Sequence, residues 1–127
     1  MKKNIHTNKG QTLIILLMYM IIAIIVTTAS VALVINNSRG TDKLYQGTNA
    51  LDIAESGAET AMIKLLRDPN FAGETLTIGS GQAVITVSGT NPKTVLSKGT
   101  LNNFTRTIQV TVDTSGNTVT VTSWKEI

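Results

Sequence analysis

Hydrophobic residues are concentrated at the start of the chain, and their distribution predicts a membrane segment. The run from Leu13 to Ile35 contains no charged side chain. As a helix it would extend roughly 34 Å at about 1.5 Å per residue, while the hydrocarbon core of a bilayer is about 30 Å thick. The pattern therefore predicts one membrane-spanning helix near the N-terminus.

The next region, residues 36–67, has the pattern of an amphipathic helix. Apolar residues recur at steps of three, four or seven, which places them on one helix face: Leu44, Leu51, Ala54, Ala58, Ala61, Met62 and Leu65. The two regions together predict a nearly continuous helix from about Thr12 to Arg67. Asp68-Pro69-Asn70 should end it, because the residue before a proline is disfavoured in helical conformation.

Three glycines interrupt this predicted helix at Gly40, Gly47 and Gly57. Each should weaken it by about 1 kcal/mol relative to alanine. Gly40 follows the polar residues Asn36, Asn37 and Ser38, so we expect a kink or a melted turn at that position.

The last part of the chain, residues 68–127, has the alternating pattern of β-strands. Residues 73–89 predict two strands around Gly79-Ser80-Gly81, and residues 104–124 predict two more around the turn at 114–117. Apolar residues alternate with threonines, so one face of the sheet should be buried and the other solvated. The Leu51 to Leu65 stripe is the expected partner of the buried face. The predicted fold class is α+β: a long N-terminal helix packed against a small antiparallel sheet.

The net charge of +3 is confined to the start of the chain, at Lys2, Lys3 and Lys9. From Gln11 onward eight basic residues balance eight acidic ones, so the charge does not support nucleic-acid binding. The chain also contains no cysteine, which excludes disulfides, thiolate metal sites and a cysteine nucleophile.

The charges that flank the apolar run predict its orientation. Three lysines precede it, against Arg39 and Lys43 after it, which favours a cytoplasmic N-terminus and an exported remainder. Two alternatives remain open. A single-pass protein could stay in the membrane and present the sheet as a binding module, or a secreted domain could be released after Ala32, although the apolar run is longer than a usual signal peptide.

The sequence KGQTLIILL resembles the processing site of the type IV pilin and type II secretion pseudopilin family. In that family a short basic leader ending in glycine is removed by a prepilin peptidase on the cytoplasmic side. By this resemblance, residues 1–10 are the leader, cleavage falls between Gly10 and Gln11, and Gln11 becomes the N-methylated first residue. The segment LDIAESGAETAMIKLL is similar to the segment with an A-E-x-G-A-E core in many minor pilins. The resemblance extends from the start of the chain to about Arg67.

The chain departs from this family at one position. The family usually has glutamate at the fifth mature position, where the acid pairs with the N-terminal amine of a neighbour, and this chain has Ile15. Some minor pilins and the pseudopilins thought to sit at the filament tip also lack that acid, so the resemblance implies a minor subunit. Gln11, where phenylalanine or methionine is more usual, is a smaller deviation.

The resemblance implies partners and a location. Residues 11–35 would be the transmembrane and assembly helix, which packs against other pilin subunits, and the inner-membrane assembly machinery would be a further partner. The subunit would wait in the cytoplasmic membrane, in contact with lipid, and then enter a filament at the cell surface.

Residues that suggest catalysis or ligand binding have simpler interpretations. His6 is the only histidine and would leave with the leader, so Ser56 has no histidine base, and we expect neither an enzyme nor a cofactor. Asp52, Glu55 and Glu59 share one side of the predicted helix. By default they form a solvated face. The alternatives are a contact with Arg39 or Lys43 of another subunit, or a metal cluster, and we expect no metal site. Three aromatic residues should cap the small core: Tyr45, Phe104 and Trp124.

Overall fold

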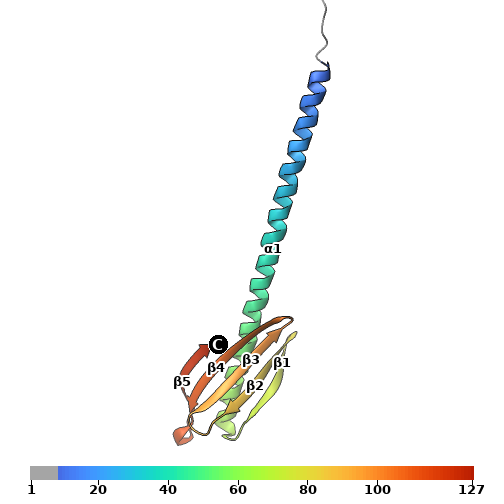
Figure 1. The fold of residues 1–127 in the computed structure, drawn as a ribbon. Coiled ribbons are helices and arrows are strands. Elements are labelled where there is room, and N and C mark those ends of the chain that lie inside the picture. The colour runs from blue at the N-terminus through green and yellow to red at the C-terminus, as the bar shows by residue number, and fades with distance from the viewer. Residues whose placement is uncertain (1–8) are drawn as a thin grey trace, which may run out of the picture. The chain divides into compact units, whose positions relative to one another are not determined.

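The structure is a computed structural model that describes residues 9–127, and it confirms the α+β fold (Figure 1). One helix is followed by five strands in a single antiparallel sheet of order β1-β2-β3-β4-β5. The elements are α1 (Lys9–Arg67), β1 (Gly73–Ile78), β2 (Gly81–Ser88), β3 (Lys93–Leu101), β4 (Phe104–Asp113), the short 3₁₀ helix η1 (Ser115–Asn117) and β5 (Thr120–Glu126). The chain forms two compact units, with the boundary between Thr41 and Asp42.

The predicted helix and its C-terminal end are confirmed. The N–H group of Asp68 donates to the carbonyl of Lys64 at 2.7 Å, and the Asp68 carboxylate accepts the N–H of Asn70 at 2.9 Å. The prediction of a melted turn at Gly40 is wrong, since residues 36–41 are helical throughout. A glycine costs only about 1 kcal/mol in a helix, and the turns on either side propagate the helix cooperatively.

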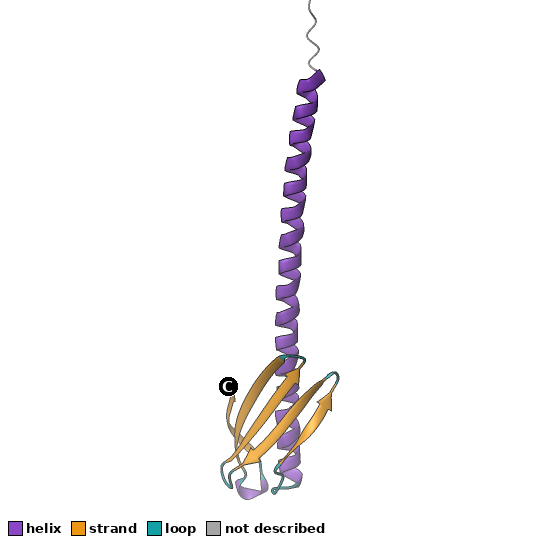
Figure 2. Ribbon diagram, turned by 45° about the vertical axis from the view of Figure 1, so that its right-hand side comes forward, coloured by secondary structure: helices purple, strands orange, loops and turns teal. Residues whose placement is uncertain are grey.

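In the second unit, residues 42–127, α1 covers one face of the sheet (Figure 2). The predicted stripe is confirmed for Ala54, Ala58, Ala61 and Leu65, which are buried together with five sheet residues: Ile85, Val95, Ile108, Val110 and Val112. A second cluster combines Ala50 and Ile53 with Ala83 and Leu101. Leu44, which the stripe included, is instead 75 % exposed.

Glycines allow the backbone of α1 to approach the sheet closely. A Cβ atom added to Gly99 of β3 would contact the carbonyl oxygen of Ala50 and lie 2.5 Å from the amide nitrogen of Ala54. A Cβ atom added to Gly57 would contact the hydroxyl of Ser97 and lie 2.9 Å from the Cβ atom of Ala83. Gly57 is therefore a packing position, and its cost to helix propensity is offset by the contact that it permits.

The sheet has five strands where the sequence pattern predicted four, because β3 was missed. The side of β3 that faces α1 carries Val95, Ser97, Gly99 and Leu101, all of them buried. Two of these four have no apolar side chain, so the alternation that marks a strand is absent from the sequence. The close contact with α1 requires small residues at Ser97 and Gly99. Because these residues are not apolar, the alternation that would predict a strand is lost.

The buried hydroxyl of Ser97 provides a test of this packing. Its oxygen has no hydrogen-bond partner among the described residues, and the side chain is fully buried. Because a buried polar group without a partner is costly, we expect Ser97→Ala to leave stability unchanged or raise it by about 1 kcal/mol. Thermal unfolding of the full chain in detergent measures this, with the exposed Ser123→Ala as control. A clear loss of stability in Ser97→Ala alone would contradict the unpaired state of the hydroxyl.

The aromatic residues divide between core and surface. Phe104 is partly buried and packs against the cluster of Ala50 and Leu101, as expected. The same prediction is wrong for Tyr45, which is 68 % exposed, whereas Trp124 is 39 % exposed and pairs with the buried Val110 of β4. Trp124 lies on β5, an edge strand on which every residue is exposed.

Candidate membrane and assembly helix

The first unit presents an apolar helix without any protein cover. Every described side chain from Gly10 to Thr41 is exposed. The large apolar ones are Leu13, Ile14, Ile15, Leu16, Leu17, Met18, Tyr19, Met20, Ile21, Ile22, Ile24, Ile25, Val26, Val31, Leu33, Val34 and Ile35. Contiguous apolar surface of this extent is typical of a membrane or protein contact. The helix is long and apolar enough to cross a bilayer.

Three hydroxyl side chains inside this apolar segment are satisfied by their own helix. The hydroxyls of Thr27, Thr28 and Ser30 donate to the carbonyls of Ala23, Ile24 and Val26 at 2.9, 2.7 and 2.9 Å. In hydrocarbon an unpaired hydroxyl would be costly, because no water is present to accept its hydrogen bond. These back-bonds make the segment compatible with lipid and with a helix bundle.

Small residues make part of this helix suited to helix packing. Ala23 and Thr27 lie about one helical turn apart in a shallow depression that Tyr19, Ile22 and Val26 also line. Small side chains at this spacing let the backbones of neighbouring membrane helices approach one another. A surface of this kind is compatible with a neighbouring helix.

The predicted processing site lies at the start of α1. Gly10 and Gln11 are helical and exposed, and a side chain added at Gly10 would meet no atom within 4 Å. Ile15, at the position of the missing assembly acid, is 64 % exposed. Lys2, Lys3 and His6 fall outside the described residues.

The residues predicted to make charge contacts lie along α1 and are available for a partner. Arg39, Lys43, Asp52 and Glu59 are exposed, and Glu55 is half-buried. Within residues 9–127, ion pairs join Lys64 with Glu74 and Arg106 with Glu126, so none of the five is paired. The alanines of the neighbouring stripe, Ala54, Ala58 and Ala61, are buried.

No three acidic or histidine side chains among residues 9–127 are placed to share a metal ion.

Two other hydrogen bonds of the second unit have structural roles. The Ser56 hydroxyl donates to the carbonyl of Asp52 at 2.8 Å, a bond internal to the helix. The N–H group of Ser115 donates to the Asp113 carboxylate at 2.8 Å and lowers the pKa of Asp113, which stabilises the turn after β4.

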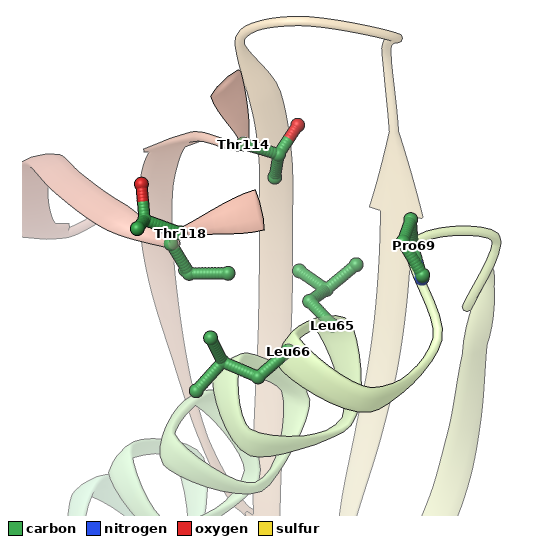
Figure 3. A pocket seen from close by; sticks show the side chains of 6 residues that line it. Leu65, Leu66, Pro69, Thr114 and Thr118 are labelled. Carbon is green, nitrogen blue, oxygen red and sulfur yellow. The ribbon is translucent and has the colours of Figure 1, made fainter. Parts of the chain in front are cut away.

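A small pocket of about 90 Å³ lies at the C-terminal end of α1, between Leu65, Leu66, Pro69, Thr114, Thr118 and Val119. Figure 3 shows the hydroxyl oxygens of Thr114 and Thr118 pointing away from the two leucines. At about 90 Å³ the pocket is far smaller than the roughly 300 Å³ at which ligand pockets begin, so it is a packing imperfection rather than a ligand site.

A groove between α1 and the end of the sheet was not predicted. It has a volume of about 310 Å³ and is lined from the helix by Lys43, Leu44, Gly47, Thr48 and Leu51, and from the sheet by Phe104, Arg106 and Glu126. Arg106 and Glu126 form an ion pair at 2.8 Å. The groove combines residues that are distant in sequence, so only the tertiary fold reveals it.

Comparison of the chain with known protein families, with curated proteins and with solved structures finds no match in any of the three.

Proposed function

We propose that this chain is a minor pilin or pseudopilin subunit of a type IV pilus or a related secretion filament. The observation that carries the proposal is the exposed apolar part of α1, which continues into the helix that covers the sheet. The hydroxyls of Thr27, Thr28 and Ser30 in this part are satisfied within the helix. Such a helix suits two environments in succession, the lipid bilayer and the apolar core of a helical filament.

The proposed mechanism is processing followed by assembly. A prepilin peptidase removes residues 1–10 on the cytoplasmic side, and Gln11 becomes the methylated N-terminus. The inner-membrane assembly machinery then moves α1 from the lipid into a bundle of other pilin helices, and the sheet stays outside. The unpaired Arg39 and Lys43 contact Asp52, Glu55 or Glu59 of a neighbouring subunit, because charges left unpaired on one copy can pair across an interface.

Intact-mass analysis of the exported protein tests the cut. We expect an N-terminus at Gln11 that carries one added methyl group, since Gly10 precedes the apolar run in the position of a leader end. A protein that still begins at Met1 would favour the anchored binding module. A protein that begins at Leu33 would favour the secreted domain. Either result contradicts the pilin proposal.

The substitution Gly10→Leu tests the residue before the cut. A peptidase site shaped for glycine has no room for leucine, so we expect the variant to insert in the membrane, remain unprocessed and be absent from filaments. Gly40→Leu is the matched control, since Gly40 is also an exposed helical glycine with no atom near its missing side chain. It should be processed normally. Normal processing of Gly10→Leu would show that the site lies elsewhere.

A further inference from the structure

The two edges of the sheet differ in how they are protected. β1 forms one edge and β5 the other (Figure 1). On β1, Glu74 lies opposite the buried Ile85 and forms an ion pair with Lys64 of α1, so its charge points toward the core side of the sheet. A charge that points inward on an edge strand disfavours pairing with a further strand. β1 is therefore a protected edge.

The edge strand β5 has no such protection along its middle. Trp124 and Val121 lie opposite buried valines of β4, so both face the side of the sheet that α1 covers. Both are nevertheless exposed. The lysine of this strand, Lys125, lies on the opposite, solvated face. The middle of β5 thus presents apolar side chains, and no charge, on its core side.

The backbone of β5 also has hydrogen-bonding groups that no other strand satisfies. The N–H group of Ile127 donates to the carbonyl of Thr107 at 3.0 Å, so these two residues form a hydrogen-bonded pair. Bonded and non-bonded pairs alternate in an antiparallel ladder, so the N–H and C=O groups of Glu126 and Trp124 point away from β4. Among residues 9–127 no strand lies beyond β5. A further β-strand is the structure that fits such a row, because its donors and acceptors recur at the same spacing.

The helix α1 adds apolar surface beside both ends of β5. Leu66 lies with Val119, which shortly precedes β5, and Leu44 lines the groove of about 310 Å³ together with Glu126. Both leucines are exposed. A strand placed beyond β5 would cover Trp124 and direct alternate side chains toward these leucines. All of these residues belong to the second compact unit.

We propose that the free edge of β5 binds an extended segment of another protein of the filament, which joins the five-stranded sheet as a further strand. The segment has apolar side chains at alternate positions, because alternate residues face Trp124 and the leucines of α1. Main-chain hydrogen bonds hold the segment, and its apolar positions give specificity. This inference rests on the proposed function and adds a partner to it. A minor subunit is surrounded by other proteins of the filament, so a different protein is the expected occupant rather than a second copy.

A strand appended to the chain itself tests whether the edge accepts one. The extension Thr-Asn-Gly-Thr-Thr-Val-Thr-Val-Thr-Val follows Ile127: its first threonine lengthens β5, Asn-Gly forms the turn, and the valines fall on the side of Trp124. The control extension has proline in place of each valine, which removes the N–H groups that would bond to β5. In the full chain in detergent, we expect only the valine extension to raise the melting temperature by several degrees and to shift the emission of Trp124 to shorter wavelength.

The same two extensions test the partner in cells. We expect the valine extension to occupy the edge and to reduce the amount of the protein in sheared filaments several-fold, as measured by immunoblotting. The proline extension should match the native chain, and intact mass should show that all three chains begin at Gln11. Because the chain has no cysteine of its own, Ser123→Cys with a short bismaleimide tests for a second copy at β5. We expect no dimer.

Each other outcome overturns a defined part of the proposal. An unchanged melting temperature with the valine extension would show that the edge accepts no strand. Native amounts of the valine-extended chain in filaments, or an equal loss with the proline extension, would show that no partner uses the edge. These results would leave the proposed function intact. A cysteine-linked dimer would identify a second copy as the occupant, contrary to the proposal, and absence of the native chain from filaments would overturn the proposed function as well.

Discussion

Gly99→Ala is expected to lower the melting temperature of the sheet unit by about 10 to 20 °C. The new methyl group would contact the carbonyl oxygen of Ala50 and lie 2.5 Å from the amide nitrogen of Ala54. Both atoms belong to the backbone of α1, so no side-chain rotation can make room and the helix must move off the sheet. Overpacking typically lowers the free energy of unfolding by about 1 to 3 kcal/mol, and a clash with backbone atoms should lie at the upper end of this range. For a unit of fewer than about 100 residues, such a loss lowers the melting temperature by about 10 to 20 °C.

The measurement is thermal unfolding of the full chain in detergent micelles, followed by circular dichroism and the fluorescence of Trp124, the only tryptophan. Lys98→Ala, on the adjacent exposed position of β3, should leave the melting temperature nearly unchanged. Gly57→Ala should be less harmful than Gly99→Ala, because its added methyl group meets side chains of Ser97 and Ala83 and gains about 1 kcal/mol of helix propensity. An unchanged melting temperature in Gly99→Ala would show that α1 does not approach β3 so closely.

Periodicity predicted the elements whose contacts are made by apolar side chains. Ala54, Ala58, Ala61 and Leu65 recur at helical spacing, and each is buried against the sheet. Ile108, Val110 and Val112 alternate with polar residues and form the buried side of β4. In these elements the side chain that carries the hydrophobic signal is also the side chain that makes the contact, so the pattern and the packing agree.

The hydrophobic pattern did not predict contacts that depend on small residues without an apolar side chain. Ser97 and Gly99 carry no apolar signal, yet they lie where α1 comes closest to the sheet, and β3 was missed for this reason. For the same reason the sequence presents Gly57 only as a weak point of the helix. Trp124, expected as a cap of the core, lies on the exposed edge strand β5 and pairs with the buried Val110.

The sequence predicted some parts of the candidate site and could not predict others. Residues 13–35 predicted a membrane segment by composition alone, and α1 has the length and exposure that this requires. The cleavage position at Gly10 came from a resemblance and stays a prediction. The groove at Lys43 and Phe104 is formed by elements that lie far apart in the sequence, so no local pattern could have indicated it.

Ile15→Glu is expected to allow incorporation of the protein along the whole filament. In a bundle of identical helices each N-terminal amine lies in an apolar environment, where an unpaired ammonium costs several kcal/mol. The exposed side chain of Ile15 offers no counter-charge, so copies of the native chain alone should polymerise poorly and occupy few positions. A glutamate at this position would supply the missing charge to the neighbouring subunit.

Immunogold labelling of filaments measures the effect. For the native chain we expect sparse or terminal label, and for Ile15→Glu a many-fold higher density along the shaft. Ile15→Gln is the matched control: it has nearly the shape of glutamate without the charge, so it should label as sparsely as the native chain. Dense and uniform label with the native sequence would show that the subunit is a major pilin, and that a group other than residue 15 neutralises its amines.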